Sequence, residues 1–269
     1  MQNNKDTLSA LNISRFTENI FAPDRIFALK TVNSTNSYAK NLALEHSDQH
    51  ETVVISDSQT AGRGRLGREF FSPPESGIYM SIILTPENIA LPPSHLTVAA
   101  GVAVCRAIKD ICPGSPSIKW VNDIFLEGKK VCGILAEGTL DPDTNQQKDI
   151  VVGLGLNVST KSELFPGKLN QIAGSIFPQG ITRNEIVAKI LMQFRSLYQT
   201  ASVCSLIEEY KSYSLILGKH IVFSADSKSF KGIAKDINND GNLVVLLDSG
   251  KEMTLNSGEV SLGSSNFLG

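Results

Sequence analysis

The stretch that decides between fold classes is "SDSQTAGRGRLGREFFSPP", residues 56–74. Its glycines at positions 62, 64 and 67 match G-x-G-x-x-G, the pattern of a dinucleotide-binding turn. That pattern requires a preceding strand and a helix directly after the third glycine. Here "REFFSPPESG" follows Gly67, and its two consecutive prolines are incompatible with a regular helix. The sequence therefore predicts a loop between two strands rather than a Rossmann turn.

The composition of this loop suits an anionic ligand. Glycines leave backbone N–H groups accessible and allow the loop to move. The guanidinium groups of Arg63, Arg65 and Arg68 match the oxygens of a phosphate or a carboxylate. No G-K-[ST] follows, which excludes a Walker loop. We expect a cationic loop that closes over an anion, and the plainer alternative is a solvated basic loop.

The segments around the loop alternate between strands and helices. "TVVIS" before it and "GIYMSIIL" after it are typical of strands. "VNSTNSYAKNLALEH" predicts a helix capped by Ser34 or Ser37, and "SHLTVAAGVAVCRAIKDI" predicts a long helix after Ser94. "SIKWVNDIFLEGKKVCGILAEGT" predicts two strands joined by a turn at residues 127–129, and "DIVVGLGLNV" predicts a buried strand.

The pattern changes in the last third of the chain. Thr182 and Glu185 form a capping-box pattern at the start of "TRNEIVAKILMQFRSLYQT", and "VCSLIEEYKSYS" predicts another helix. After Gly218 the short runs "KHIVF", "FKGIAKDI", "NLVVLLD" and "KEMTL" alternate with turn signals, which indicates a small β-barrel or sandwich. We place a domain boundary near Leu217, with residues 1–217 as a large N-terminal domain and 218–269 as a small C-terminal domain.

The overall composition limits the function. The chain has 269 residues, 41% of them hydrophobic, with a net charge of −2 and a pI of about 6.1. Broad binding to nucleic acid needs a strongly cationic face, so this balance argues against it. The four cysteines lack zinc-ligand spacing, and neither a signal peptide nor a run of about 18 apolar residues is present. We expect a soluble cytoplasmic protein with reduced thiols.

Three further motifs carry polar residues at the ends of strands or glycines inside them. In "KWVND", Lys119 either snorkels outward or points its charge into a cleft, and the neighbouring arginine loop favours the cleft. Gly133 interrupts the strand "VCGILAEG", as glycine does where a ligand approaches closely. "VVGLGLNV" ends on the polar Asn157, although its glycines also fit a tight packing point.

Taken in this order, the motifs resemble those of the biotin protein ligases (biotin–[acetyl-CoA-carboxylase] ligases). The resemblance runs from about residue 31 to 262 and rests on six motifs, which are "STN", "QTAGRGRLGR", "KWVND", "KVCGILAE", "GLGLNV" and "GEVSL". It implies an α+β fold with a mixed sheet and helices, related to class II aminoacyl-tRNA synthetases, followed by a small SH3-like β-barrel. About thirty residues precede "STN", so we expect a short form without an N-terminal DNA-binding domain.

The resemblance implies a two-step reaction. Biotin and ATP give biotinyl-5′-AMP and pyrophosphate, with Mg²⁺ accompanying ATP. The biotinyl group then passes to one lysine of a biotin carboxyl carrier domain belonging to a biotin-dependent carboxylase. No metal held by protein ligands alone, no DNA and no membrane partner are expected, and a homodimer is left open.

The resemblance also implies roles for individual residues. Those expected to bind biotin are Ser34, Thr35, Asn36, Gln59, Arg63, Gly64, Arg65, Lys119 and Gly133. Those expected to bind ATP or the adenylate are Arg63, Arg65, Arg68, Lys119, Asn122 and Asn157, with Asn157 and the segment 139–149 near the adenine. Lys119, Arg63 and Arg65 are expected to be catalytic. Two positions depart from the family pattern, since Val121 replaces a common proline and Phe70 a common tryptophan.

Three alternatives remain at this point. A lipoate ligase has a similar catalytic fold but a differently arranged glycine-rich stretch. A biotin-sensing transcriptional regulator would bind operator DNA through an N-terminal helix-turn-helix domain. A non-catalytic biotin sensor would not need the full set of arginines and lysine.

Overall fold

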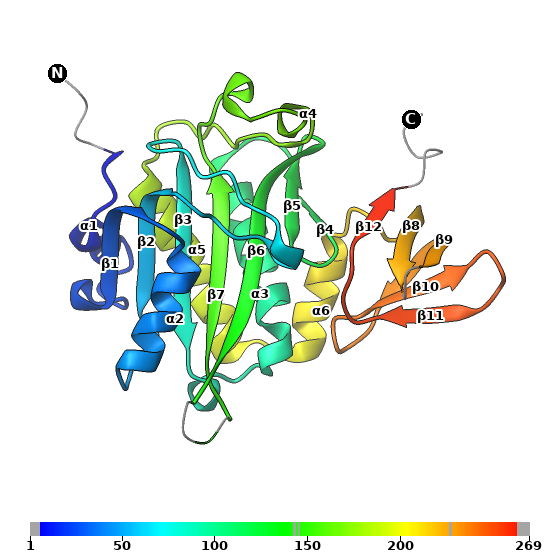
Figure 1. Cartoon of the computed structure of the whole chain (residues 1–269), viewed down its shortest axis with the longest axis horizontal. Helices are drawn as coiled ribbons and strands as arrows, with labels where there is room; N and C mark the ends of the chain where they lie inside the picture. The colour runs from blue at the N-terminus through cyan, green and yellow to red at the C-terminus, as the bar shows by residue number, and fades with distance from the viewer. Residues whose placement is uncertain (1–5, 142–143, 145, 226–227, 263–269) are drawn as a thin grey trace.

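The structure is a computed structural model and describes residues 6–141, 144, 146–225 and 228–262. Two sheets organise these residues (Figure 1). The larger sheet has the order β1-β2-β3-β7-β6-β5-β4. Its strands are β1 (Ile26–Val32), β2 (Val53–Gln59), β3 (Gly77–Leu84), β4 (Ser117–Lys119), β5 (Asp123–Leu126), β6 (Lys129–Leu140) and β7 (Gln147–Asn157). Only the pairing of β1 with β2 is parallel within this described sheet, so the sheet is mixed.

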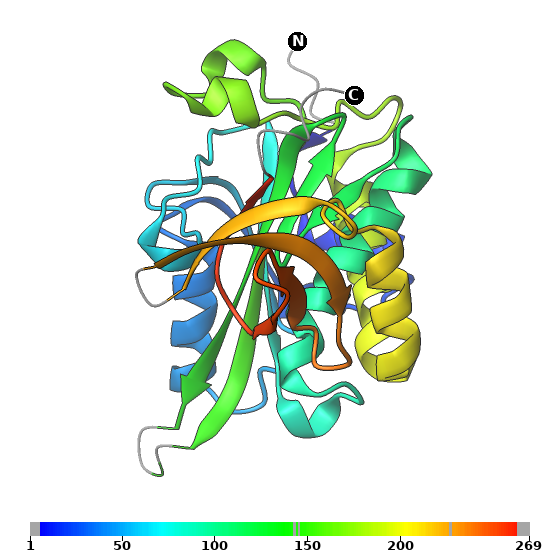
Figure 2. The ribbon, with the colours of Figure 1, turned by 90° about the vertical axis from the view of Figure 1, so that its right-hand side faces the viewer.

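Helices cover both faces of the large sheet. They are α1 (Ala10–Phe16), α2 (Thr35–Glu45), α3 (Leu96–Ile111), α4 (Leu169–Ile172), α5 (Arg183–Thr200) and α6 (Val203–Ser212). Single 3₁₀ turns lie at Pro23–Arg25, Arg65–Gly67, Pro86–Asn88, Pro93–His95 and Ser162–Leu164. Figure 2 shows α2 on one side of the sheet and α3 and α6 on the other. None of the helices in the described ranges is long and apolar enough to cross a membrane.

The two faces are packed differently. On the α2 side, Ala39 and Ala43 pack against Val54, Ile83 and Val151 in a small apolar cluster. The opposite face carries the main core, in which α3 is buried along most of its length because its small side chains allow close packing. The loop between β2 and β3 lies on the α2 side, since its Phe70 covers Gly155 while Asn36 of α2 covers Gly153 on the same strand.

The C-terminal sheet lies beyond the β4 edge of the large sheet (Figure 1). It is antiparallel with the order β11-β10-β9-β8-β12, from β8 (His220–Ala225), β9 (Lys228–Ile237), β10 (Leu243–Leu247), β11 (Glu252–Leu255) and β12 (Val260–Leu262). The indole N–H of Trp120 donates to the carbonyl of Gly241, at 2.9 Å. The turn between β9 and β10 is thereby attached to the "KWVND" segment.

The predicted fold class is confirmed, a mixed sheet with helices followed by a small antiparallel sheet. The capping box at Thr182 and Glu185 is present, and Ser34 rather than Ser37 caps α2. The segment 117–139 was predicted to form two strands. That prediction is wrong, because the segment contains three strands, β4, β5 and β6. Helix α1 and strand β1 were not predicted. The domain boundary near Leu217 stays a prediction.

Candidate functional site

Lys119 and two glycines lie in one row across the large sheet. Lys119 on β4 pairs with Asp123 on β5, Asp123 pairs with Gly133 on β6, and Gly133 pairs with Gly155 on β7. Residues paired directly across strands project to the same face of a sheet. The side chain of Lys119 therefore projects from the face on which the backbone of Gly133 and Gly155 is uncovered by side chains of their own.

Asn36 identifies this face as the one covered by α2. Its amide donates to the carbonyl of Leu135 at 3.2 Å and to Oε2 of Glu137 at 2.9 Å, and its Oδ1 accepts from Ser81 at 2.6 Å. A Cβ atom at Gly153 would lie 1.9 Å from Oδ1 of Asn36, so only glycine lets this amide reach the sheet. The "STN" motif is thus fixed against β6 and β7.

Gln59 joins the start of α2 to the arginine loop. The backbone N–H of Thr35 donates to Oε1 of Gln59 at 2.9 Å, and the hydroxyl oxygens of Thr35 and Ser81 lie 2.8 Å apart. The Nε2 of Gln59 donates to the hydroxyl of Ser72 at 2.9 Å, on the segment that returns from the loop. Ser34, Thr35 and Gln59, all predicted to bind biotin, therefore lie together.

The arginine loop has a defined backbone. Phe70 N–H donates to the carbonyl of Gly62 at 2.9 Å, and Gly64 N–H donates to the carbonyl of Arg68 at 2.7 Å. Inside this hairpin Leu66 and Gly67 have φ values of 57° and 73°, in the left-handed region that glycine adopts easily. The loop therefore reverses direction between Arg65 and Arg68, and its arginines diverge from the tip.

Each arginine of the loop contacts a different part of the molecule. Arg63 donates to Oε1 of Glu137 on β6 at 2.9 Å. Arg65 donates to Oδ1 of Asn122 in the lysine motif at 3.0 Å. Arg68 forms a two-pronged ion pair with Glu259, just before β12, with one contact of 2.8 Å. The loop thus connects Glu137 on β6, the lysine motif and the C-terminal sheet.

Two carboxylates, Glu137 and Glu259, form ion pairs with arginines of the loop. Burial tends to raise the pKa of Glu137, but the hydrogen bond from Asn36 and the charges of Lys40 and Arg63 outweigh it, so its pKa is lowered. The pKa of Glu259 is lowered too, chiefly by the hydrogen bond from Arg68, with a smaller contribution from Lys119. Both carboxylates are therefore ionised at neutral pH, and the charge of Lys119 acts within reach of Glu259.

The ring of Phe70 covers the two glycines of the row. A Cβ atom at Gly155 would come within 2.4 Å of the ring, and one at Gly133 within 3.3 Å. The ring also meets Tyr79 edge-on, with centroids 6.4 Å apart. Gly133 was predicted to lie against bound biotin, and in this structure Phe70 occupies the space above it.

The lysine motif is held from several sides. Asn122 donates to the carbonyl of Ile134 at 2.8 Å, and the hydroxyl of Tyr210 donates to the carbonyl of Val121 at 2.9 Å. The Trp120–Val121 peptide bond is cis. Among the described residues, the ammonium group of Lys119 has no hydrogen-bond or ion-pair partner, whereas Lys130 pairs with Asp123 at 2.6 Å. Lys119 is thus a half-buried cation available to an incoming anion.

Asn157 provides an unused polar atom at the end of β7. The residue is 4% exposed, its Nδ2 donates to the carbonyl of Gly174 at 3.0 Å, and its Oδ1 has no partner among the described residues. A cavity of about 270 Å³ is lined by Gly174 and residues 160–163, 165, 175 and 177. A buried acceptor without a partner is rare, and it suits a donor group on a ligand.

One predicted pairing around Asn157 is wrong. The segment 139–149 was expected near the same adenine, and residues 142, 143 and 145 of it lie outside the described residues. Leu140 pairs with Gln147 at one end of β7, and Asn157 lies at the other end. Eleven residues form this strand, so its ends are about 33 Å apart at about 3.3 Å per residue. The two cannot contact one adenine.

The structure also identifies polar residues that were not assigned from the sequence. These are Ser72, Ser81, Lys130 and Glu137, all of which contact residues of the site. Glu137 had a detectable signal, because alternation along β6 places it on the same face as Gly133, four residues earlier. Ser81 had none, since its contact with α2 depends on how the helix crosses the sheet.

Comparisons with known proteins agree with this arrangement. Residues 28–157 match the Biotin/lipoate A/B protein ligase family, and residues 216–263 match the Biotin protein ligase C terminal domain. The bifunctional ligase/repressor BirA of Bacillus spizizenii is 32% identical over 238 residues, which cover 86% of this chain and 72% of the relative. The biotin–[acetyl-CoA-carboxylase] ligase of Mycobacterium tuberculosis is 29% identical and covers 84% of this chain and 85% of its own.

A solved structure supports the same relationship. The biotin protein ligase of Aquifex aeolicus in complex with biotin and ATP superposes with a TM-score of 0.73 at 27% identity. The match covers 88% of this chain and 98% of that one, and so includes both sheets. With the arginine loop, the lysine motif and the C-terminal sheet in these relative positions, the chain belongs to the biotin protein ligase family.

Proposed function

We propose that this chain is an ATP-dependent biotin protein ligase that activates biotin as biotinyl-5′-AMP and transfers it to a lysine of a biotin carboxyl carrier domain. The observation that supports this best is the position of the arginine loop, which contacts the Asn36–Glu137 side and the lysine motif at once through Arg63 and Arg65. Two anions bound between these groups would meet cations from both sides.

The first step joins a carboxylate to a phosphate. An oxygen of the biotin carboxylate attacks the α-phosphorus of ATP, a C–O–P bond forms, and the bond to the β-phosphate oxygen breaks to release pyrophosphate. The carboxylate is already ionised, so no general base is needed. The barrier lies in bringing two anions together and stabilising charge at phosphorus, which alignment and preorganised cations reduce.

We assign Arg63, Arg65 and Lys119 to this task. Arg63 would exchange Glu137 for the substrate anion, which is compatible with its side chain being 45% exposed. Lys119 needs no such exchange, since it has no ion-pair partner among the described residues. Gly64 lets the loop backbone approach the ligand, and Arg68, paired with Glu259, would hold the loop in place.

The biotin side of the site follows from the polar cluster at α2. Ser34, Thr35, Asn36 and Gln59 offer hydroxyl and amide groups suited to the ureido ring of biotin. Phe70 would move from Gly133 and Gly155 or pack beside the bound ligand, and a phenyl ring can pack in this way without donating a hydrogen bond. On the nucleotide side, the unpaired Oδ1 of Asn157 would accept from the adenine amino group.

The second step is acyl transfer to an amine. The ε-amine of the carrier lysine attacks the carbonyl carbon of the mixed anhydride, an amide bond forms, and AMP leaves. Water would hydrolyse the anhydride, so a loop that closes over it protects the intermediate. No residue is assigned as the base that removes the proton from the lysine.

Mg²⁺ is part of the proposal only as a companion of ATP. This ion keeps several waters and is bound through one or two carboxylates together with substrate phosphates. In the described ranges no three His, Cys, Asp or Glu side chains form a group that could hold a metal ion. Water and the phosphates of ATP would therefore supply most of its ligands.

Biotin-dependent ATP–pyrophosphate exchange tests the first step, and labelling of a carrier domain tests the second. Lipoate in place of biotin is the control, because only the true substrate supports exchange. The match of residues 216–263 to the Biotin protein ligase C terminal domain favours biotin. Pyrophosphate exchange that lipoate supports and biotin does not would contradict the proposal.

The remaining expectations concern partners and location. The proposed partner is a carrier domain of a biotin-dependent carboxylase, and no DNA partner is included because the net charge is −2. A mobility-shift assay tests DNA binding, because the name of the Bacillus relative includes the word repressor. Light scattering distinguishes a monomer from a homodimer. The four cysteines are free thiols, in keeping with the expected cytoplasmic location.

A further inference from the structure

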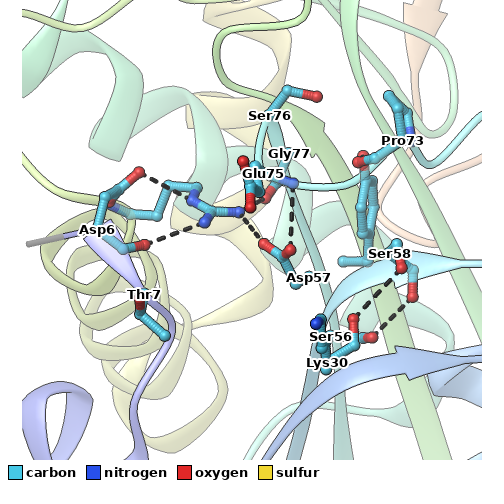
Figure 3. A network of polar contacts seen from close by, with 12 residues as sticks. Asp6, Thr7, Lys30, Ser56, Asp57, Ser58, Pro73, Glu75, Ser76 and Gly77 are labelled. Atoms are coloured by element: carbon cyan, nitrogen blue, oxygen red, sulfur yellow. Dashed lines mark hydrogen bonds and ion pairs between the residues drawn. The ribbon is translucent and has the colours of Figure 1, made fainter. Parts of the chain in front are cut away.

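Arg183 and its hydrogen-bond acceptors form a buried polar cluster, called the node below. It lies at the base of the arginine loop, at the opposite end from the loop's tip. It is the first residue of α5, and its side chain is 5% exposed. Figure 3 shows the groups around it, with Asp6 from the N-terminal segment on one side and Asp57 and Gly77 on the other. None of the roles assigned above belongs to Asp6, Asp57 or Arg183.

The guanidinium group donates four side-chain hydrogen bonds, of the five that an arginine can donate. Its Nε donates to Oδ2 of Asp6 at 3.0 Å, and one Nη donates to the Asp6 carbonyl at 3.0 Å. The other Nη donates to Oδ1 of Asp57 at 2.6 Å and to the carbonyl of Gly77 at 3.0 Å. A buried arginine is costly without such partners, so this set of contacts holds its members in one geometry.

On the Asp57 side, the node contacts both stems of the arginine loop, which are the segment that leads into the loop and the segment that returns from it. Asp57 lies near the end of β2, two residues before Gln59, and Gly77 is the first residue of β3. The second oxygen of Asp57 accepts from the backbone N–H of Glu75 at 3.2 Å, on the returning stem. One carboxylate thus links the outgoing strand, the returning segment and Arg183.

A second contact reinforces the returning stem. The hydroxyl of Tyr79 donates to the carbonyl of Pro73 at 2.8 Å, and the ring of Tyr79 meets Phe70 edge-on. The stem is therefore supported on the Arg183 side by Asp57 and on the site side by Gln59 and Tyr79. A change at Asp57 would reach the loop without touching any residue proposed to bind substrate.

We infer that Asp57, held by Arg183, is a positioning residue for the reaction: it fixes the spacing of the two loop stems so that Gln59 and the arginines meet biotin in one geometry. Asp6 serves the same guanidinium from the opposite side and contacts neither stem through its side chain. The two carboxylates differ in function, although both neutralise Arg183. This inference rests on the proposed biotin ligase activity.

The test compares Asp57→Asn with Asp6→Asn. Each substitution removes one negative charge beside the same guanidinium and keeps the shape of the side chain. The new amide nitrogen cannot accept the hydrogen bond that a carboxylate oxygen accepted. Arg183→Ala is unsuitable because it leaves two carboxylates without their cation. The readouts are the KM for biotin and kcat in pyrophosphate exchange, the rate of trypsin cleavage at arginines 63, 65 and 68, and the melting temperature.

Asp57→Asn is expected to raise the KM for biotin roughly tenfold with kcat within about threefold, and to accelerate cleavage of the loop several-fold, since a loosened stem misplaces the binding groups. Asp6→Asn should leave KM and cleavage unchanged. An unchanged KM in Asp57→Asn, or equal rises in both variants that follow their melting temperatures, would overturn the inference. Absence of biotin-dependent exchange in the unsubstituted protein would contradict the proposed function, while the cleavage assay would still test the loop.

Discussion

The ring of Phe70 lies directly over the backbone of Gly155, so closely that a Cβ atom at 155 would come within 2.4 Å of Cε1. The atoms in conflict belong to the far end of a side chain and not to the backbone. Gly155→Ala should therefore displace the ring and the loop that carries it, while the free energy of unfolding stays within about 1 kcal/mol of the original. Biotin-dependent exchange should fall by about 10²-fold, because the loop arginines lose their alignment.

Gly138→Ala is the matched control on the neighbouring strand β6. Among the residues that the structure describes, a Cβ atom there meets Gln147 alone, at 3.9 Å, which is an ordinary contact. This variant should retain full exchange activity. Equal activity in the two variants would show that the position of Phe70 is irrelevant to the reaction.

Lys119→Ala should slow adenylation by roughly 10²–10³-fold, the range found when one donor that stabilises a developing negative charge is removed. The row that pairs Lys119 with Asp123, Gly133 and Gly155 places its charge on the face of the site. Lys109→Ala, at an exposed position near the end of α3, is the control for loss of one lysine. Pyrophosphate release at a near-normal rate from Lys119→Ala would remove this residue from the mechanism.

Much of this arrangement could be predicted from the sequence, and the reason is local. The prolines after Gly67 exclude a helix, and the capping box at Thr182 marks the start of α5, because both effects act within a few residues. Gly133 was predicted to be a point where a ligand approaches the strand closely, and this stays a prediction. What approaches it in this structure is Phe70, and no local pattern could identify that partner.

The elements that were missed depend on distant partners. Strand β1 has mixed burial along its length and is defined by its parallel pairing with β2. Glu137 and Ser81 are polar residues in apolar strands, and each has a role only because α2 lies across them. Spacing predicts the face on which a side chain lies, but not the segment that covers that face.

Glu137 should make the stability of the protein depend on acidic pH. Its pKa is lowered from 4.5 in the folded state, because the hydrogen bond from Asn36 and the charges of Lys40 and Arg63 together outweigh the effect of burial. A lowered folded pKa gives stability that is fully present above the ordinary value and is lost as the pH falls through the folded value. The difference in unfolding free energy between the original protein and Glu137→Gln should therefore be constant from about pH 8 to pH 5.5 and shrink below about pH 4.5.

Urea unfolding at a series of pH values measures this difference. Glu208→Gln is the control, since Glu208 is 73% exposed and its pair with Lys211 lies on the helix surface. Exposed pairs of this kind contribute about 0–1 kcal/mol. A difference for Glu137→Gln that grows toward low pH would contradict the sign derived from its contacts.

The arginine loop should become resistant to trypsin when the adenylate binds. Arg63, Arg65 and Arg68 are potential cleavage sites, and the side chains of Arg63 and Arg68 are 45% and 64% exposed in this structure. In the proposed complex Arg63 and Arg65 would contact the anionic junction, and the loop would close over it, so the scissile bonds would no longer fit a protease. Cleavage after residues 63, 65 and 68 should slow by at least about tenfold with biotin and ATP together. Biotin with a nonhydrolysable ATP analogue blocked at the α,β-bridge should protect less, because the adenylate cannot form. Equal cleavage with and without both substrates, measured by mass spectrometry of the fragments, would mean that the loop does not close over the intermediate.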